Sequence, residues 1–166
     1  MSQAKQETLL DLAEDFDTAM LVTRAKNGDL RSRPMALAEV KDDGTFFFAT
    51  DDGSEKIAEI QAEGEVNLVF QSGGKYLSIS GRATKLEDKS RIKELWKTSW
   101  KVWFPEGKDD PNLCLLRVDG RRGEYWDVSG TNGIAYLWEA GKALVQGERL
   151  SVDDASMNAK AELVTA

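Results

Sequence analysis

The sequence predicts a mainly β fold of the α+β class: a small antiparallel barrel with flanking helices. Three observations support this prediction. Six or seven short segments have the alternation, or the β-branched and aromatic content, of strands. Tight turn signals separate several of them, at Asn27-Gly28, at residues 41–44 (KDDG) and at residues 72–74 (SGG). Strands and helices do not alternate regularly along the chain, which argues against a parallel sheet and favours a closed barrel.

The first half of the chain is expected to supply a helix and three consecutive strands. An apolar stripe at helical spacing, formed by leucines and Phe16, predicts the helix before the first strand. The turn at Asn27-Gly28 predicts a tight hairpin between the first two strands. The expected elements are a helix over residues 2–16, strands over 18–25, 30–40 and 45–50, and a short helix over 54–62.

The second half of the chain is expected to complete the barrel and end in a tail. The expected elements are strands over 65–71 and 76–86, a helix over 87–96, an aromatic-rich segment over 100–104, strands over 112–119 and 124–128, and a helix over 133–145. No repeat or linker interrupts the chain, so residues 1–166 are read as one domain. The polar tail from about residue 147 is expected to be disordered.

The composition of the chain argues against nucleic acid and membranes as binding partners. The chain has 166 residues, of which 41% are hydrophobic and 31% charged, as in an ordinary globular domain. Its net charge of −7 opposes binding to nucleic acid and to anionic membranes. No apolar run approaches the roughly 20 residues of a membrane span. We therefore expect neither nucleic acid nor membrane as a partner.

The counts of cysteine and histidine limit the chemistry. The one cysteine, Cys114, lies between leucines and is read as a buried apolar residue. A chain with one cysteine forms no internal disulfide, which fits a reducing compartment and predicts a cytoplasmic protein. The chain has no histidine, so histidine-based triads and histidine metal sites are excluded. Chemistry must come from carboxylates, lysines, tyrosines or a bound cofactor, and no catalytic residue or metal site is assigned.

A strand, loop and helix over residues 45–62 are suited to holding a phosphate. Thr50 ends the strand, and Ser54 and Lys56 open the helix. A helix N-terminus offers N–H groups and partial positive charge, and a lysine adds full charge. The alternative is a solvated lysine on a surface helix. The phosphate site is favoured because Arg33 and Thr50 are expected to converge on it from neighbouring strands.

Two further features suggest how a ring system could bind. Pro34 removes a ladder donor, so its strand is expected to lie at an edge or opening, where free backbone groups can bond a heterocycle. Arg31 is read as a surface charge. Most of the tryptophans are expected to pack in the core or in an interface. Trp126 is the candidate for a wall beside the bound ring.

Several segments, in their order and spacing, resemble a known family. They are residues 33–35 (RPM), 48–56 (FATDDGSEK), 76–81 (YLSISG), 94–96 (ELW), 103–111 (WFPEGKDDP), 115–118 (LLRV) and 124–127 (EYWD). Together they resemble the flavin-binding split-barrel proteins related to pyridoxamine 5′-phosphate oxidase, and among these the bacterial general stress proteins. The resemblance covers about residues 9–127.

This resemblance implies a six-stranded Greek-key split β-barrel that forms a homodimer, with FMN bound between the subunits. It implies that the flavin ring lies along Arg33, Pro34, Met35 and Ala36. It also implies that Thr50, Ser54 and Lys56 contact the ribityl chain or the phosphate. FAD or a deazaflavin remains an alternative to FMN.

The sequence also departs from the oxidase. Glu55 stands where the oxidase has an arginine, and the C-terminal arginine-rich segment has no counterpart, so oxidation of pyridoxamine phosphate is not expected. Three hypotheses remain. The protein is an FMN-dependent oxidoreductase on an unknown small substrate, a flavin-binding stress, storage or sensor protein without turnover, or a structural dimer with an empty groove.

Overall fold

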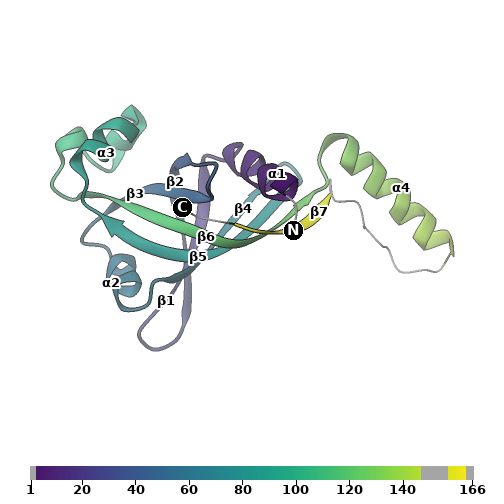
Figure 1. Cartoon of the computed structure of the whole chain (residues 1–166), viewed down its shortest axis with the longest axis horizontal. Helices are drawn as coiled ribbons and strands as arrows, with labels where there is room; N and C mark the ends of the chain where they lie inside the picture. The colour runs from purple at the N-terminus through teal and green to yellow at the C-terminus, as the bar shows by residue number, and fades with distance from the viewer. Residues whose placement is uncertain (1–2, 147–156, 164–166) are drawn as a thin grey trace.

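A computed structural model describes residues 3–146 and 157–163 of the chain (Figure 1). Its centre is an antiparallel sheet with strand order β3-β2-β1-β4-β5-β6-β7. The strands are β1 Thr18–Arg24, β2 Leu30–Val40, β3 Thr45–Asp51, β4 Glu65–Ser72, β5 Lys75–Leu86, β6 Leu113–Asp127 and β7 Asn158–Glu162. The helices are α1 Gln3–Glu14, α2 Glu55–Ala62, α3 Lys89–Leu95 and α4 Gly130–Gln146, with short 3-10 turns η1 Thr98–Val102 and η2 Gly107–Asp109.

The first six strands close into a barrel because β3 pairs with β6 as well as with β2. The connection through α2 carries the chain from β3 across to β4, which returns beside β1. The predicted mainly β class and six-stranded split barrel are therefore confirmed. The hairpin expected at Asn27-Gly28 also forms, with Gly28 at a φ of 90°, where a side chain would be strained.

The prediction of two separate strands over 112–119 and 124–128 is wrong, because β6 is continuous. Its first part pairs with β3 and its second part with β7, while β5 runs beside nearly all of it. Two glycines between the expected strands allow close packing. A Cβ on Gly123 would lie 2.3 Å from Leu9 of α1, and one on Gly120 would lie 2.6 Å from Leu163.

The structure describes residues 157–163 of the tail expected from about residue 147. Among them, Asn158–Glu162 form β7, which pairs with residues 122–126 of β6. Disorder is therefore the wrong expectation for this stretch. The alternation of buried Ala159 and Ala161 with exposed Lys160 is a strand pattern that the polar composition concealed. Residues 147–156 lie outside the described residues.

The main core fills the barrel and the space beneath α1. Leu9, Leu10 and Ala13 of α1 are buried against it, and Phe70 packs on Phe16 with ring centroids 5.4 Å apart. A second, smaller cluster lies at the other end of the barrel under α3 and η1. Its buried members are Ile92, Trp100, Phe104, Leu113 and Leu115. This second cluster includes Trp100 of η1 and Ala38 of β2, and it therefore holds η1 against β2.

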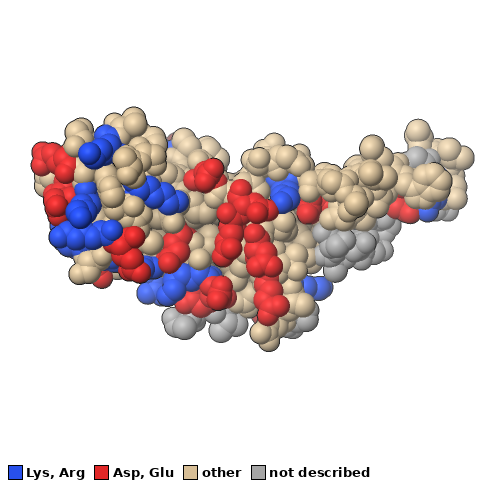
Figure 2. Space-filling model, turned by 90° about the horizontal axis from the view of Figure 1, so that it is seen from above, with Lys and Arg blue, Asp and Glu red and all other residues tan. Residues whose placement is uncertain are grey.

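The helix α4 projects from the barrel at the end opposite α3 (Figure 1). Figure 2 shows charged side chains gathered over the barrel and the α3 end, whereas the visible surface of α4 is mostly uncharged. Among the described residues, no helix is long and apolar enough to cross a membrane.

Candidate functional site

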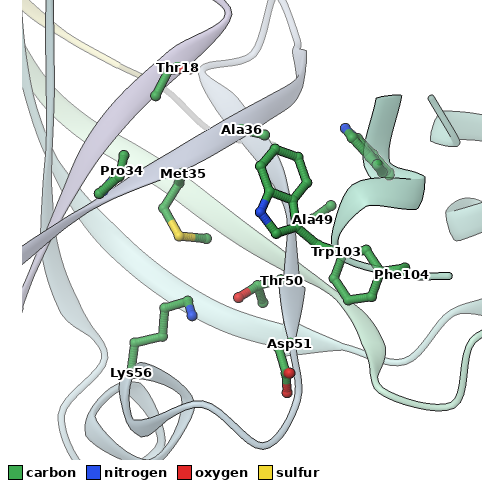
Figure 3. Close-up of a pocket in the computed structure, with 11 residues that line it drawn as sticks. Thr18, Pro34, Met35, Ala36, Ala49, Thr50, Asp51, Lys56, Trp103 and Phe104 are labelled. Carbon is green, nitrogen blue, oxygen red and sulfur yellow. The ribbon is translucent and has the colours of Figure 1, made fainter. Parts of the chain in front are cut away.

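A pocket of about 410 Å³ lies between β2, β3, the start of α2 and η1, within the size range of small-molecule sites (Figure 3). Residues from four elements and one turn line it: Thr18, Pro34, Met35, Ala36, Ala49, Thr50, Asp51, Lys56, Trp100, Trp103 and Phe104. Five of the eight residues expected to bind a cofactor are among them. These are Pro34, Met35, Ala36, Thr50 and Lys56.

One wall of the pocket is the unpaired edge of β2. Pro34, Met35 and Ala36 pair with β1 on one side. On the other side, the pairing of β2 with β3 begins only at Leu37, next to a register shift between Leu37 and Glu39. The opening that Pro34 predicted therefore exists. It presents backbone groups of β2 to the pocket, where they can bond to a flat heterocycle.

Thr50 and Lys56 face the same space from β3 and α2. Figure 3 shows the Thr50 hydroxyl and the Lys56 ammonium pointing into the pocket, with Met35 between β2 and Lys56. Thr50 is 4% exposed and lies opposite Cys114 in the β3–β6 ladder. A hydroxyl and an ammonium that converge in this way suit an anionic group.

The loop before α2 holds Lys56 through Ser54. The Lys56 ammonium donates to Ser54 Oγ at 2.8 Å, and Ser54 Oγ donates to the Asp51 carbonyl at 2.7 Å. Ser54 is the N-cap residue of α2, but its side chain makes no capping hydrogen bond. The start of α2 therefore offers its amide groups and partial positive charge beside Lys56. Ser54 itself does not line the pocket.

The charge of Lys56 is affected by its surroundings. Burial, and secondarily the positive charge of Arg33, lower the pKa of Lys56, while Asp51 and Glu59 act in the opposite direction. An ammonium in this state gains from a nearby anion, because the anion stabilises the charged form. The pocket thus contains a cation that favours a negatively charged ligand.

Arg33 does not line the pocket and belongs to a cluster around the buried Glu59. Its guanidinium bonds to Glu59 Oε2 at 3.0 Å and to the hydroxyl of Thr23. Arg31 bonds to Glu59 Oε1 at 3.3 Å and to the exposed Glu55 at 2.9 Å. Arg31 was read as a surface charge, yet one of its partners is the buried carboxylate of Glu59. Arg33 contributes positive charge near Lys56 without lining the pocket.

An aromatic wall that the sequence analysis did not assign closes the side opposite β2. Trp100 is 2% exposed and packs edge-on against Trp96, as expected for a core tryptophan. Phe104 is also buried, whereas Trp103 is 65% exposed at the pocket mouth (Figure 3). The sequence signal was the density of aromatic residues before Pro105. It did not indicate which ring faces the pocket.

Trp126 lies outside the pocket of its own chain. It stands on the outer face of the sheet, opposite Tyr76 of β5, and is 38% exposed. Met20 and Val69, which face each other on β1 and β4, are exposed to a similar degree. Met20 also pairs with Pro34. The outer sheet face therefore carries apolar side chains that continue from the pocket edge.

Cys114 does not line the pocket, although it lies opposite Thr50 in the β3–β6 ladder. Cys114 is buried, as predicted, and burial raises the pKa of its thiol to about 11, so it stays protonated at neutral pH. Within residues 3–146 and 157–163, no group of three or more cysteine, aspartate or glutamate side chains is arranged to hold a metal ion.

The closed six-stranded barrel, with a pocket formed by an open strand edge and a helix start, defines the class of split-barrel proteins. The chain belongs to the family described as "Pyridoxamine 5′-phosphate oxidase like", whose sequence model matches residues 4–151. General stress protein 26 of Bacillus subtilis is 28% identical over 120 residues, covering 69% of this chain and 82% of that protein.

Solved structures agree with this assignment. A protein described as a general stress protein 26 from Jannaschia sp. CCS1 is 25% identical with a TM-score of 0.75, and covers 98% of this chain and 100% of its own. That coverage includes α4. A general stress FMN/FAD binding protein from Xanthomonas citri is 28% identical with a TM-score of 0.65, covering 75% of this chain and 89% of its own.

Proposed function

We propose that this protein binds FMN in the pocket between β2 and α2. One observation carries the proposal: Lys56, Thr50 and the uncapped start of α2 face the same cavity as the open edge of β2. One end of the cavity suits a phosphate and the other suits a planar ring. The likeness to a protein described as FMN/FAD binding supports the same ligand.

The lining residues suggest an orientation for the ligand. The phosphate lies at Lys56 and Thr50, and the ring lies along Pro34, Met35 and Ala36, with Trp103 across the mouth of the pocket. Arg33 can reach the phosphate only by leaving Glu59. In this arrangement the charge of Arg33 acts on the site without lining it. Ser54 acts by holding the Lys56 ammonium.

We further propose a homodimer in which the outer sheet face of one subunit covers the pocket of the other. Met20, Val69, Tyr76 and Trp126 form an exposed apolar patch on that face, next to Pro34 at the pocket edge. In this dimer Trp126 reaches the ring bound by the partner, which accounts for its place outside its own pocket. Sedimentation showing only monomer at micromolar concentration contradicts this part of the proposal.

A bound flavin would supply electron transfer, and the chain would supply orientation and charge. Asp51 and Lys56 are the titratable side chains that line the pocket, so proton movement near the ring falls to them or to water. We propose a cytoplasmic oxidoreductase acting on a small substrate. The second candidate is a flavin-binding protein without turnover, which is favoured by this small set of acid–base groups.

The visible spectrum of freshly purified protein, before and after FMN is added, tests the proposal first. Bound FMN gives a yellow protein and a raised melting temperature, since a ligand that binds the native state stabilises it. A colourless protein with no shift at excess FMN supports the empty-groove hypothesis instead. Anaerobic bleaching by NADH, with turnover above that of free FMN, separates the enzyme from the binding protein.

A further inference from the structure

One face of α4 is apolar and largely exposed in the part of the chain that the structure describes, where Trp138 contacts the Lys142 ammonium of the same helix, 5.7 Å from its ring centroid. Ile134, Leu137, Trp138, Leu144 and Val145 follow helical spacing and are between 69% and 87% exposed. We call these five residues the α4 apolar face. Glu139 lies on the opposite side of the helix and pairs with Lys142 at 2.6 Å. The helix is therefore amphipathic although it stands away from the barrel (Figure 1).

The size of this face indicates an interface. At roughly 100 to 200 Å² for each exposed side chain, the five residues present on the order of 500 Å² of apolar surface. Exposed patches of this size on a soluble protein usually mark an interaction site. A specific protein interface buries about 800 Å² on each partner. The α4 apolar face can supply more than half of that area.

A second copy of this chain fits better than a membrane surface. The net charge of −7 opposes anionic lipids, and the one cation of α4, Lys142, is paired with Glu139. A helix that binds membrane surfaces by charge carries several unpaired lysines or arginines on its polar face. The occupant of the α4 apolar face is therefore expected to be an apolar protein surface.

A matching apolar surface lies at the far end of the same molecule. Val102, the last residue of η1, is 80% exposed, and Trp103, the next residue, is 65% exposed and lines the pocket. We call these two residues the η1 rim. The α3–η1 end and the α4 end lie at opposite ends of the long axis (Figure 1). Distance prevents α4 from covering the rim of its own chain.

We propose that the α4 apolar face of each subunit packs on the η1 rim of its partner and closes the outer wall of the partner's pocket. A two-fold axis perpendicular to the long axis brings opposite ends together and makes both contacts at once. The proposed dimer already places Trp126 at the partner's pocket. Because α4 begins four residues after Trp126, the helix starts close to that pocket. This inference rests on the dimer proposed above and adds that α4 controls access to the partner's pocket.

Disulfide trapping tests the contact directly. The native Cys114 is buried, so an introduced cysteine provides the reactive thiol. The double variant Val102→Cys/Leu137→Cys is expected to form a covalent dimer on mild oxidation. The matched control Val102→Cys/Glu139→Cys places the second thiol on the opposite side of α4 and is expected to cross-link at least tenfold more slowly. Equal rates in the two variants, or no cross-linked dimer in either, overturn the proposal.

Sedimentation and cross-linking together distinguish a failure of the α4 contact from a failure of the proposed dimer. Sedimentation of the wild-type chain as a dimer, with no cross-link through Leu137, overturns the α4 contact alone. Sedimentation as a monomer overturns both. Co-sedimentation of wild-type protein with anionic phosphatidylserine vesicles, lost in Leu137→Asp, assigns the face to a membrane and also overturns the contact.

A charge substitution gives a second, independent measurement. Leu137→Asp is expected to raise the dimer dissociation constant at least tenfold, because it places a carboxylate in an apolar contact. Ala135→Asp, exposed but off the apolar stripe, is the matched control and is expected to change it less than threefold. Circular dichroism checks that both variants fold. Equal dissociation constants for the two variants contradict the contact.

Discussion

The carboxylate of Glu59 binds the guanidinium of Arg33, with 3.0 Å between Glu59 Oε2 and Arg33 Nη2. The Glu59 side chain is 7% exposed, and the same oxygen accepts a hydrogen bond from Thr23 at 2.6 Å. Arg31 bonds to the other oxygen. One carboxylate of α2 thus holds two arginines of β2, and it keeps the positive charge of Arg33 near Lys56 although Arg33 does not line the pocket.

The first prediction is that Glu59→Gln destabilises the fold by about 1–3 kcal/mol at pH 7, because it removes the charged partner of the partly buried Arg33 and leaves Arg31 paired with the exposed Glu55. The hydrogen bond from Thr23 and the charges of Arg33 and Arg31 lower the pKa of Glu59, against the effect of burial. A lowered carboxyl pKa contributes stability above the ordinary value, 4.5, and this contribution disappears as the pH falls through the folded value. The wild-type advantage in urea unfolding should therefore shrink below about pH 4.5.

The matched control for this prediction is Glu55→Gln. Glu55 also pairs with Arg31, but its side chain is 85% exposed, so its loss should change stability by less than about 0.5 kcal/mol. A similar loss in both variants, or a difference from wild type that stays constant between pH 7 and pH 3, contradicts the role given to the buried Glu59.

The second prediction concerns the phosphate. Lys56→Met should weaken FMN binding by about 10- to 100-fold, the range expected when a hydrogen bond between charged groups is lost. Binding of riboflavin, which has no phosphate, should not change. Isothermal titration with both ligands measures this. Lys85→Met is the control, since Lys85 pairs with Asp52 and Glu87 outside the pocket lining. Equal losses for FMN and riboflavin would place Lys56 at the ring instead.

The third prediction is a fall in FMN affinity at alkaline pH. Burial and the charge of Arg33 lower the pKa of Lys56 below 10.5, so the ammonium loses its proton earlier than an ordinary lysine does. A bound phosphate favours the charged form, and affinity therefore decreases as the pH rises through the lowered pKa. A series of FMN titrations from pH 7 upward, corrected by riboflavin at each pH, measures the change. The same series with Lys56→Arg should be flat, because arginine stays charged.

The sequence predicted the barrel well because its signals are local. The turn at Asn27-Gly28 and the alternation in β4 and β5 each depend on a few neighbouring residues. The errors came from long-range contacts. The strand β6 was divided in two, whereas Gly123 within it lets Leu9, more than one hundred residues away in sequence, pack closely against the continuous strand. The strand β7 likewise exists only because β6 offers it an edge.

In the candidate site, too, the features with local sequence signals were predicted and those that depend on long-range contacts were not. Thr50 and Lys56 were identified because the strand, the loop and the helix are consecutive in the chain, and the structure places both in one pocket. The position of Arg33 depends on Glu59, which comes from a different element and carries no local signal. The side on which Trp103 lies depends on how η1 packs over the second core cluster. Neither relationship can be obtained from residue spacing alone.

The fourth prediction separates the ring from the phosphate. Trp103 stands at the pocket mouth, where its indole can contact a planar ring. Trp103→Ala should therefore weaken FMN and riboflavin binding equally, by roughly 3- to 10-fold, the range given by the loss of one aromatic contact.

Trp103 also gives this prediction an optical readout. Wild-type tryptophan fluorescence should be quenched as FMN is added, and the Trp103→Ala variant should lose part of that quenching. Leu30→Ala is the control, because Leu30 is 67% exposed on β2 but does not line the pocket. If Trp103→Ala reduced FMN affinity while riboflavin affinity stayed at the wild-type value, the ring would not lie against this wall, and the orientation proposed for the ligand would have to be reversed.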